Sequence, residues 1–392
     1  MIPLFKVYMS PKAPEEVTKT LTSGFITQGP KVDAFESLLQ TTLNTPYVLT
    51  LNSATSGLTM ALKLLITPDP ATHWPGIDLT QDIVLSTPLT CFATNASIIA
   101  NHLPIQWVDT DPNTCNMCLL DLERKINHRT KVIYLVHWGG TPIDLHALRD
   151  ILDRKEVELG FRPQVVQDAA HAFLSCFDNQ NISNFNHITV YSLQAIKHLT
   201  TVDGGVITIP TKTLYDRAKL LRWYGIDRDQ RNYNRKDLRL ENDITEVGSK
   251  WHMNDVNATI GICNLDHIHT LIQKHRDHAA YYNQHLANLT TITLLTPPTL
   301  SQSSYWIYTI KVQNDLLQPF MEFMIQHGIT TSQVHKRNDV HSCVSAFKSP
   351  LPQLDSLQDQ YVCIPVGWWL TPQDLEHITK TIYAFDAEMQ AN

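Results

Sequence analysis

Four side chains in the middle of the chain could act together in amino-group chemistry. Asp168 ends an apolar run, and His171 follows it three residues later. Ser192 ends the next apolar run, and Lys197 comes five residues after it. A lysine amine can bind the aldehyde of pyridoxal phosphate as a Schiff base, and a carboxylate can keep the pyridine nitrogen protonated so that the ring accepts electrons. These residues therefore predict an enzyme that uses pyridoxal phosphate.

The elements that position these residues alternate between about residues 45 and 210. Short runs, apolar on both faces, are separated by helix-length segments, as is typical of a mostly parallel sheet covered by helices. We expect strands at residues 47–51, 83–86, 105–108, 132–136, 165–167, 189–192 and 206–209. Functional residues collect beyond the carboxyl ends of such strands. Asp168 and Lys197 are expected there.

A helix is expected over residues 53–66, directly after the first strand. Leu58, Leu62 and Leu65 recur at helical spacing, and Ser53 or Thr55 could cap the helix. Small residues at a helix start leave backbone N–H groups open to an anion. An ordinary capped helix is the alternative, but the presence of Lys197 and Asp168 favours a phosphate site here.

The rest of the chain predicts a second, smaller unit. Residues 225–248 are polar and charged, and they predict either a lid or a solvated connection. A helix is expected from about 254 to 278, a strand at 308–312 and a terminal helix at 371–385. We expect a large domain at 1–255, with an N-terminal arm at 1–30, and a smaller α+β domain at 256–392.

Composition limits the classes of function. The 392 residues carry a net charge of −7, which disfavours a general nucleic-acid or anionic-membrane binder. No apolar run is long enough to span a bilayer, and no signal pattern is present, so a cytoplasmic enzyme is expected. Seven irregularly spaced cysteines suggest reduced thiols. Cys115 and Cys118 lack a second pair at zinc-site spacing, so no metal is expected.

Several segments, in order along the chain, resemble the DegT/StrS sugar-nucleotide aminotransferases. They are residues 23–36, 52–56, 90–94, 136–142, 168–172, 192–197, 221–225 and 250–255. The resemblance covers nearly the whole chain and implies the fold of a fold-type I pyridoxal-phosphate aminotransferase. That fold has a large domain with a mostly parallel seven-stranded sheet and a smaller α+β C-terminal domain.

The resemblance also implies a role for each matching residue in binding the cofactor. Lys197 resembles the Schiff-base lysine that also shuttles a proton, and Asp168 resembles the partner of the pyridinium nitrogen. His171 stands where the family contacts the phenolic oxygen, and Phe92 where an aromatic stacks on the ring. The phosphate would be held by the remaining matches: Ala54, Thr55 and Ser192.

Two positions depart from the family pattern near the phosphate. Ala54 stands where glycine is commoner, although its backbone donor remains. Lys250 stands where many relatives place an asparagine that reaches the phosphate across a dimer. A lysine keeps a donor there and adds positive charge. The resemblance therefore implies a homodimer with shared active sites.

The implied reaction is transfer of the amino group of glutamate to a 4-keto or 3-keto 6-deoxyhexose attached to a nucleotide. The nucleotide, the sugar and the biosynthetic pathway stay open. We expect eight residues to contact the substrate. Some lie in regions that the family uses near the substrate, and others are cations that could bind a phosphate or carboxylate. They are Lys31, His137, Trp138, Arg222, Tyr224, Tyr305, Tyr308 and His335.

Three alternatives remain open from the sequence. A pyridoxal-phosphate-dependent sugar dehydratase shares the fold, although some members of that class have histidine in place of the Schiff-base lysine. A regulatory or scaffold protein could have kept the fold, since fold alone does not define function. An amino-acid aminotransferase would need an arginine for the substrate carboxylate, and Arg337 is the only arginine in the C-terminal hundred residues.

Overall fold

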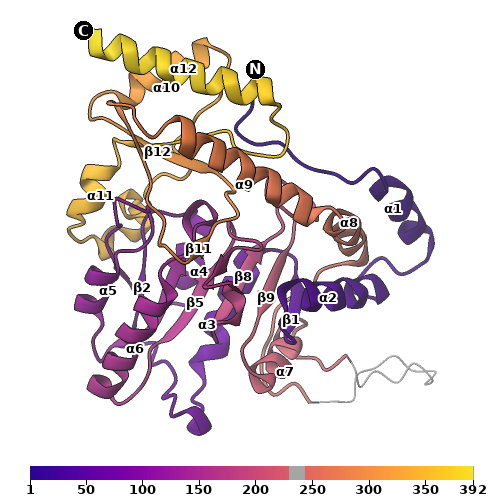
Figure 1. Ribbon diagram of the computed structural model, residues 1–392. Coiled ribbons are helices and arrows are strands. Elements are labelled where there is room, and N and C mark those ends of the chain that lie inside the picture. The colour runs from indigo at the N-terminus through magenta and orange to yellow at the C-terminus, as the bar shows by residue number, and fades with distance from the viewer. Residues whose placement is uncertain (229–242, 392) are drawn as a thin grey trace.

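The computed structural model describes residues 1–228 and 243–391 (Figure 1). The helices are α1 (Ala13–Thr22), α2 (Pro30–Leu43), α3 (Ala54–Ile66), α4 (Phe92–Ile99), α5 (Leu119–Lys125), α6 (Leu145–Leu159), α7 (Lys212–Leu221), α8 (Asp255–Leu265), α9 (Ile268–His285), α10 (Leu317–Gln326), α11 (Pro352–Leu357) and α12 (Pro372–Ala391). The strands are β1 (Val48–Leu51), β2 (Ile83–Ser86), β3 (Ile105–Trp107), β4 (Thr130–Val136), β5 (Gln164–Asp168), β6 (Cys176–Phe177), β7 (Gln180–Asn181), β8 (Ile188–Ser192), β9 (Gly205–Thr208), β10 (Ile292–Leu294), β11 (Ser301–Gln302), β12 (Tyr308–Val312) and β13 (Tyr361–Ile364).

A seven-stranded sheet forms the centre of the molecule, in the order β1-β9-β8-β5-β4-β2-β3. Five of its strands, from β8 to β3, pair in parallel. Strand β9 is antiparallel to both of its neighbours, β1 and β8. All seven strands lie at the positions expected from the sequence, within two residues at each end. The predicted α/β fold class is confirmed.

Both faces of this sheet are buried because its strands alternate between two hydrophobic clusters. In β4, Val132 and Tyr134 contribute to one cluster, and Ile133 and Leu135 to the other. Helices α3, α4 and α7 supply the first cluster, whereas α2, α5, α6 and α8 supply the second. Runs that are apolar on both faces are what a sheet covered on both sides requires.

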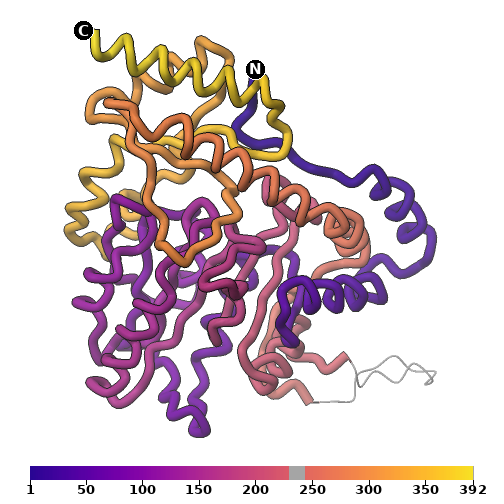
Figure 2. The backbone as a smooth tube through the Cα atoms, in the orientation of Figure 1, coloured from indigo at the N-terminus to yellow at the C-terminus, as the bar shows by residue number. Residues whose placement is uncertain are grey.

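A smaller unit is built around the antiparallel sheet β10-β12-β13. Helices α10 and α12 and the last part of α9 pack on it in a third hydrophobic cluster. The N-terminus lies beside α12 in Figure 1, and Ile2 forms a bridge to Ile329 of this unit. Figure 2 shows the chain then running away from this unit to α1 and α2. The arm at 1–30 therefore links the two parts.

The second half of the chain differs from the sequence-based expectation in its helices. The single helix expected at 254–278 is wrong, because α8 and α9 are separate helices that meet at Asp266 and His267. Residues of α8 and the start of α9 contribute to the second cluster of the large sheet. The boundary at residue 255 stays a prediction, and most of residues 225–248, expected to be a lid or a solvated connection, lies outside the described residues.

Candidate active site

The ends of three adjacent strands form one edge of the large sheet. Gly205 pairs with Leu51 on one side and with Ser192 on the other, so the end of β1, the start of β9 and the end of β8 share a row. The chain leaves β1 directly into α3. A Cβ atom on Gly205 would lie 2.5 Å from the backbone nitrogen of Ala54. Glycine is therefore needed for β9 to pass the start of α3.

The start of α3 offers backbone donors at this edge. Ser53 is the N-cap, and its hydroxyl accepts a hydrogen bond of 3.1 Å from the N–H of Ser56. Ala54 and Thr55 follow as the first helical residues, whose N–H groups have no carbonyl partner within the helix. Ser192 lies in the neighbouring row. The three residues predicted to hold a phosphate are thus brought to one edge.

Asp168 is the last residue of β5, the strand next to β8, and its side chain is buried. Thr94 Oγ1 donates a hydrogen bond of 2.6 Å to Asp168 Oδ2, and the N–H of Ala170 donates one of 3.0 Å to Oδ1. Burial raises the pKa of Asp168, while these two hydrogen bonds and the nearby Lys197 lower it. The carboxylate is thus held in one orientation by two donors.

Lys197 lies in the turn between β8 and β9. Its Nζ is 3.4 Å from the centroid of the Trp306 ring, and the Trp306 indole N–H donates a hydrogen bond of 2.8 Å to the carbonyl of Ile196. Burial lowers the pKa of Lys197 to about 7, although Asp168 and Cys91 oppose this effect. An amine with this pKa is largely uncharged slightly above neutral pH and can act as a nucleophile.

His171 lies in the loop after β5 and is buried against aromatic rings. Its ring stacks on Trp306 at 4.0 Å, and its Nε2 is 3.3 Å from Nε2 of His335. Its Nδ1 is buried without a hydrogen-bond partner among the described residues. Burial lowers the pKa of His171 well below its ordinary value, and Lys197 and His335 add to this effect. The ring is therefore neutral and keeps one open polar atom.

Phe92 occupies the first turn of α4, but its ring is in edge contact with His341 at 5.3 Å. Cys91, just before it, lies close enough to Lys197 to affect the pKa of that amine. Stacking of Phe92 on the cofactor ring stays a prediction. Within this segment, Cys91 is the residue whose charge interaction raises the pKa of Lys197.

Lys250 lies beside the start of α3 through its backbone. Its carbonyl accepts a hydrogen bond of 3.2 Å from Asn52 Nδ2, and the next residue, Trp251, accepts one of 2.7 Å from the N–H of Asn52. The side chain of Lys250 is exposed. Its predicted reach to the phosphate of a second copy stays a prediction.

Two of the predicted substrate residues have partners inside the protein instead. His137 is fully buried, with Nε2 2.8 Å from Gln167 Oε1 and Nδ1 accepting from the N–H of Ile143 at 3.2 Å. Arg222 is buried in an ion pair with Glu36. Both ring nitrogens of His137 and the charge of Arg222 are thus already used, and we leave both residues out of the substrate site.

Lys31 and Tyr224 lie on other elements. Lys31 is at the start of α2, where its Nζ is 4.0 Å from Glu16. Tyr224 is exposed, adopts a positive φ of 60° and packs edge-on against Trp223. No contact between the described residues joins either side chain to Lys197. Their roles in substrate binding stay predictions.

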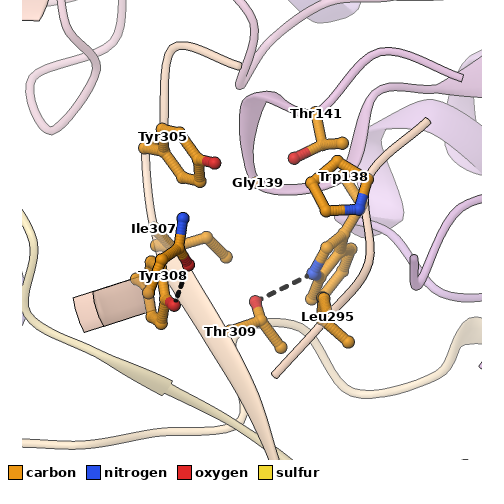
Figure 3. Close-up of a pocket in the computed structure, with 10 residues that line it drawn as sticks. Trp138, Gly139, Thr141, Leu295, Tyr305, Ile307, Tyr308 and Thr309 are labelled. Carbon is orange, nitrogen blue, oxygen red and sulfur yellow. Dashed lines mark hydrogen bonds between the residues drawn. The ribbon is translucent and has the colours of Figure 1, made fainter. Parts of the chain in front are cut away.

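The remaining predicted residues lie around Trp138. Trp138 is in edge contact with both His171 and His335 at 6.3 and 6.2 Å. On its other side, Trp138, Tyr305 and Tyr308 line a cavity of about 30 Å³ (Figure 3). Trp138 thus joins the buried histidine to this cavity.

Thr94 and Trp306 were not predicted from the sequence. Neither residue type indicates a catalytic site by itself, and each residue meets its catalytic neighbour only when the chain folds, because the two are far apart in the sequence. The aromatic run around residues 305–308 was the one available signal for Trp306, and only its tyrosines were considered.

The observed groups fit pyridoxal phosphate. An amine of lowered pKa, an oriented carboxylate, an open histidine nitrogen and the start of a helix beside a glycine lie around one edge of the sheet. Each matches one part of that cofactor: the aldehyde, the ring nitrogen, the ring oxygen and the phosphate. Among the described residues, no cluster of three or more histidine, cysteine, aspartate or glutamate side chains could hold a metal ion.

This fold and this set of residues define the class of pyridoxal-phosphate-dependent aminotransferases. The chain belongs to the DegT/DnrJ/EryC1/StrS aminotransferase family, which matches residues 8–383. Pyridoxal phosphate is its cofactor.

Two solved structures are especially similar to the chain. AtS13 from Actinomadura melliaura is 44% identical, with a TM-score of 0.91 and 98% of each chain covered. The sugar aminotransferase CalS13 from Micromonospora echinospora is 38% identical, with a TM-score of 0.91, covering 98% of this chain and all of that one. A curated relative, the dTDP-4-amino-4,6-dideoxy-D-glucose transaminase of Shigella dysenteriae, is 26% identical over 91% of each chain.

Within residues 1–228 and 243–391, no helix is both long enough and apolar enough to cross a bilayer.

Proposed function

We propose that the protein transfers the amino group of glutamate to C4 of a nucleotide-linked keto-6-deoxyhexose. The observation that carries this proposal is the placement of Lys197 and Asp168 beside the row formed by Ser192 and the start of α3. The similarity to CalS13, a sugar aminotransferase, and to the Shigella transaminase of a dTDP-linked 4-amino sugar supports a sugar nucleotide as the acceptor. The product would be an amino sugar.

The proposed roles follow from the groups around this edge. When bound, pyridoxal phosphate accepts the amino group and holds the electron pair that is left when a proton leaves the substrate carbon. The Nζ of Lys197 binds the cofactor aldehyde and, once released, carries that proton. Asp168 holds the proton on the ring nitrogen. Ser192 and the N–H groups of Ala54 and Thr55 bind the phosphate.

The open Nδ1 of His171 is proposed to face the ring oxygen of the cofactor. The neutral ring has one N–H, and an anionic oxygen favours a donor. His335 lies against the other nitrogen of His171, at 3.3 Å. We place His335 next to the cofactor-binding histidine, and Tyr305 and Tyr308 behind Trp138 toward the sugar side.

A homodimer with shared active sites is part of the proposal. Asn52 holds the backbone of Lys250 at the start of α3, while the lysine side chain is exposed. In a dimer packed through this edge, the ammonium group of Lys250 would lie at the phosphate site of the second copy. Lys31 and Tyr224 have no contact with Lys197 among the described residues, and we place them at the substrate site of the second copy.

An amino-acid aminotransferase is disfavoured by the surroundings of Arg337. Its guanidinium donates to both carboxylate oxygens of Asp339 at 2.7 Å each, and to Asp355 at 2.6 Å. A guanidinium held by two carboxylates is not open to a substrate carboxylate. The arginine that such enzymes require near the C-terminus is thus engaged in a structural network.

The acceptor is tested by incubating the holoenzyme with glutamate and a dTDP-linked 4-keto-6-deoxyhexose, followed by mass spectrometry. We expect the mass of the amino sugar nucleotide together with an equal amount of 2-oxoglutarate. The UDP-linked and GDP-linked 4-keto sugars and a 3-keto isomer run in parallel identify the nucleotide and the carbon. Loss of a hydroxyl from the sugar without 2-oxoglutarate would instead indicate the dehydratase, and no product with any keto sugar would contradict the proposal.

A further inference from the structure

Trp306 contacts both the catalytic lysine and the residue before it. The indole N–H donates a hydrogen bond of 2.8 Å to the carbonyl of Ile196, the residue directly before Lys197. The ring of the same side chain lies 3.4 Å from Lys197 Nζ. One contact fixes the backbone from which the lysine projects, and the other contacts the amine itself.

The indole is held rigidly from several directions. Trp306 is 2% exposed, and it lies just before β12, far from Lys197 in the sequence. Phe5 of the N-terminal arm stacks on it at 4.8 Å, and His171 stacks on it at 4.0 Å. Because its position is set by packing, the indole can act as a fixed surface for a side chain that moves.

An aromatic face attracts an ammonium more strongly than an amine. The ring quadrupole stabilises a cation, and the stabilisation grows when both groups are removed from water. Lys197 sits in a partly buried site where burial itself disfavours its charged form. The charged groups that shift the pKa of Lys197 are Asp168 and Cys91, and its own charge in turn lowers the pKa of the neighbouring histidines His171, His198 and His335. Asp168 and Cys91 both favour the cation.

We propose that Trp306 is a positioning residue that receives the amine of Lys197 whenever it is not bonded to cofactor and stabilises its protonated form. The inference rests on the proposed function, in which the lysine is released and must carry a proton. Without the indole, the freed amine would lose its fixed location and part of the stabilisation of its charge. Trp306 would thus act on proton transfer through Lys197 rather than on the substrate directly.

The test measures Lys197 in the cofactor-free protein. Wild type, Trp306→Phe and Trp306→Leu are labelled by reductive methylation across pH 5–10, and the Lys197 peptide is quantified by mass spectrometry. We expect Trp306→Leu to lower the pKa of Lys197 by about 1, from a cation–π contribution of the usual size. Trp306→Phe keeps an aromatic face. The pKa of Lys197 should therefore fall by less than half as much in Trp306→Phe as in Trp306→Leu.

A matched control removes a different tryptophan that lies over a lysine. Trp368 contacts Lys6, whose Nζ is 5.6 Å from the ring, so Trp368→Leu should leave the pKa of Lys197 unchanged. Thermal unfolding of each variant shows that it is folded under the labelling conditions. An equal Lys197 pKa in wild type and Trp306→Leu, or a fall as large in Trp306→Phe as in Trp306→Leu, would overturn the proposal.

The holoenzyme gives a second, independent measurement. Trp306→Leu should lower kcat about 10-fold or more while KM for glutamate changes less than 3-fold, since the contact is with the lysine and not with the donor. A rise in KM alone would contradict a positioning role. Because the labelling needs no cofactor, it remains informative if the protein fails to bind pyridoxal phosphate, a result that would refute the proposed function alone.

Discussion

Thr94 Oγ1 donates a hydrogen bond of 2.6 Å to Oδ2 of Asp168, and Thr90 Oγ1 lies 2.8 Å from Thr94 Oγ1. Both threonines are buried. Since a carboxylate can only accept, the hydrogen of Thr94 is used on Asp168, and Thr90 must donate to Thr94. The two hydroxyls therefore form a directed chain that favours the ionised form of Asp168, which burial opposes.

The first prediction concerns this chain. Thr94→Val keeps the shape of the side chain and removes the donor, which should raise the pKa of Asp168 and weaken binding of pyridoxal phosphate about 10-fold to 100-fold. Cofactor affinity is measured by fluorescence titration of the cofactor-free protein. Thr94→Ser keeps the hydroxyl and should bind within about 3-fold of wild type, and equal affinity for Thr94→Val and wild type would refute this role.

The second prediction concerns the buried ion pair between Glu36 and Arg222. Glu36 also accepts from the N–H and hydroxyl of Thr50, at 2.7 and 2.9 Å. Arg222→Met leaves the Glu36 carboxylate buried without its cation and should lower the free energy of unfolding by about 3–5 kcal/mol. Urea denaturation measures this change. The exposed pair Arg149–Asp150 is the control, and Arg149→Ala should cost less than about 1 kcal/mol.

The third prediction concerns the N-terminal arm. The buried carboxylate of Asp255 accepts hydrogen bonds from the N–H groups of Gly29, Lys31 and Val32 at 2.8, 3.2 and 3.1 Å. It thereby caps α2 from another helix, and Asp255→Ala should lower the free energy of unfolding by about 1–3 kcal/mol. Limited proteolysis should also cut near residue 29 sooner in this variant. The exposed Asp266 provides the comparison, since Asp266→Ala should resist protease as wild type does.

The fourth prediction concerns stability at acid pH. Burial lowers the pKa of both His137 and His275 to about 4. Between about pH 6.5 and 4 the unfolded chain therefore binds protons at these sites that the folded chain does not, so stability is full above pH 6.5 and falls as the pH drops toward 4. As the pH falls through this window, each histidine lowers the free energy of unfolding by about 1.4 kcal/mol per pH unit.

Thermal unfolding at pH 7.5, 6.0 and 5.0 measures this dependence. His137→Asn removes one of the titrating groups, so its melting temperature should fall less than that of wild type between pH 7.5 and 5.0. An equal fall in both proteins would show that His137 does not contribute.

The sequence predicted the large sheet well because its strands are short apolar runs buried on both faces and separated by helix-length segments. Asp168 and Lys197 could be placed at its edge for the same reason. The break between α8 and α9 was missed because the helical pattern continues across Asp266 and His267, and both residues keep helical backbone angles.

The side chains around the site were harder to predict than the elements. His137 and Arg222 have the chemistry of ligand-binding residues, but Gln167 and Glu36 satisfy them in the folded chain. Trp306 has the chemistry of a core residue, yet it contacts the catalytic amine. In each case the partner is distant in sequence, so the residue type indicates what the side chain can do and not what it contacts.

The central claim is tested most directly by the visible absorption spectrum of the purified protein with pyridoxal phosphate, before and after glutamate. We predict a band from the lysine-bound cofactor that disappears when glutamate is added, with formation of 2-oxoglutarate. Lys197→Ala should lack that band and should not turn over. A wild-type protein that never develops the band, or wild-type-like turnover by cofactor-loaded Lys197→Ala, would contradict the account.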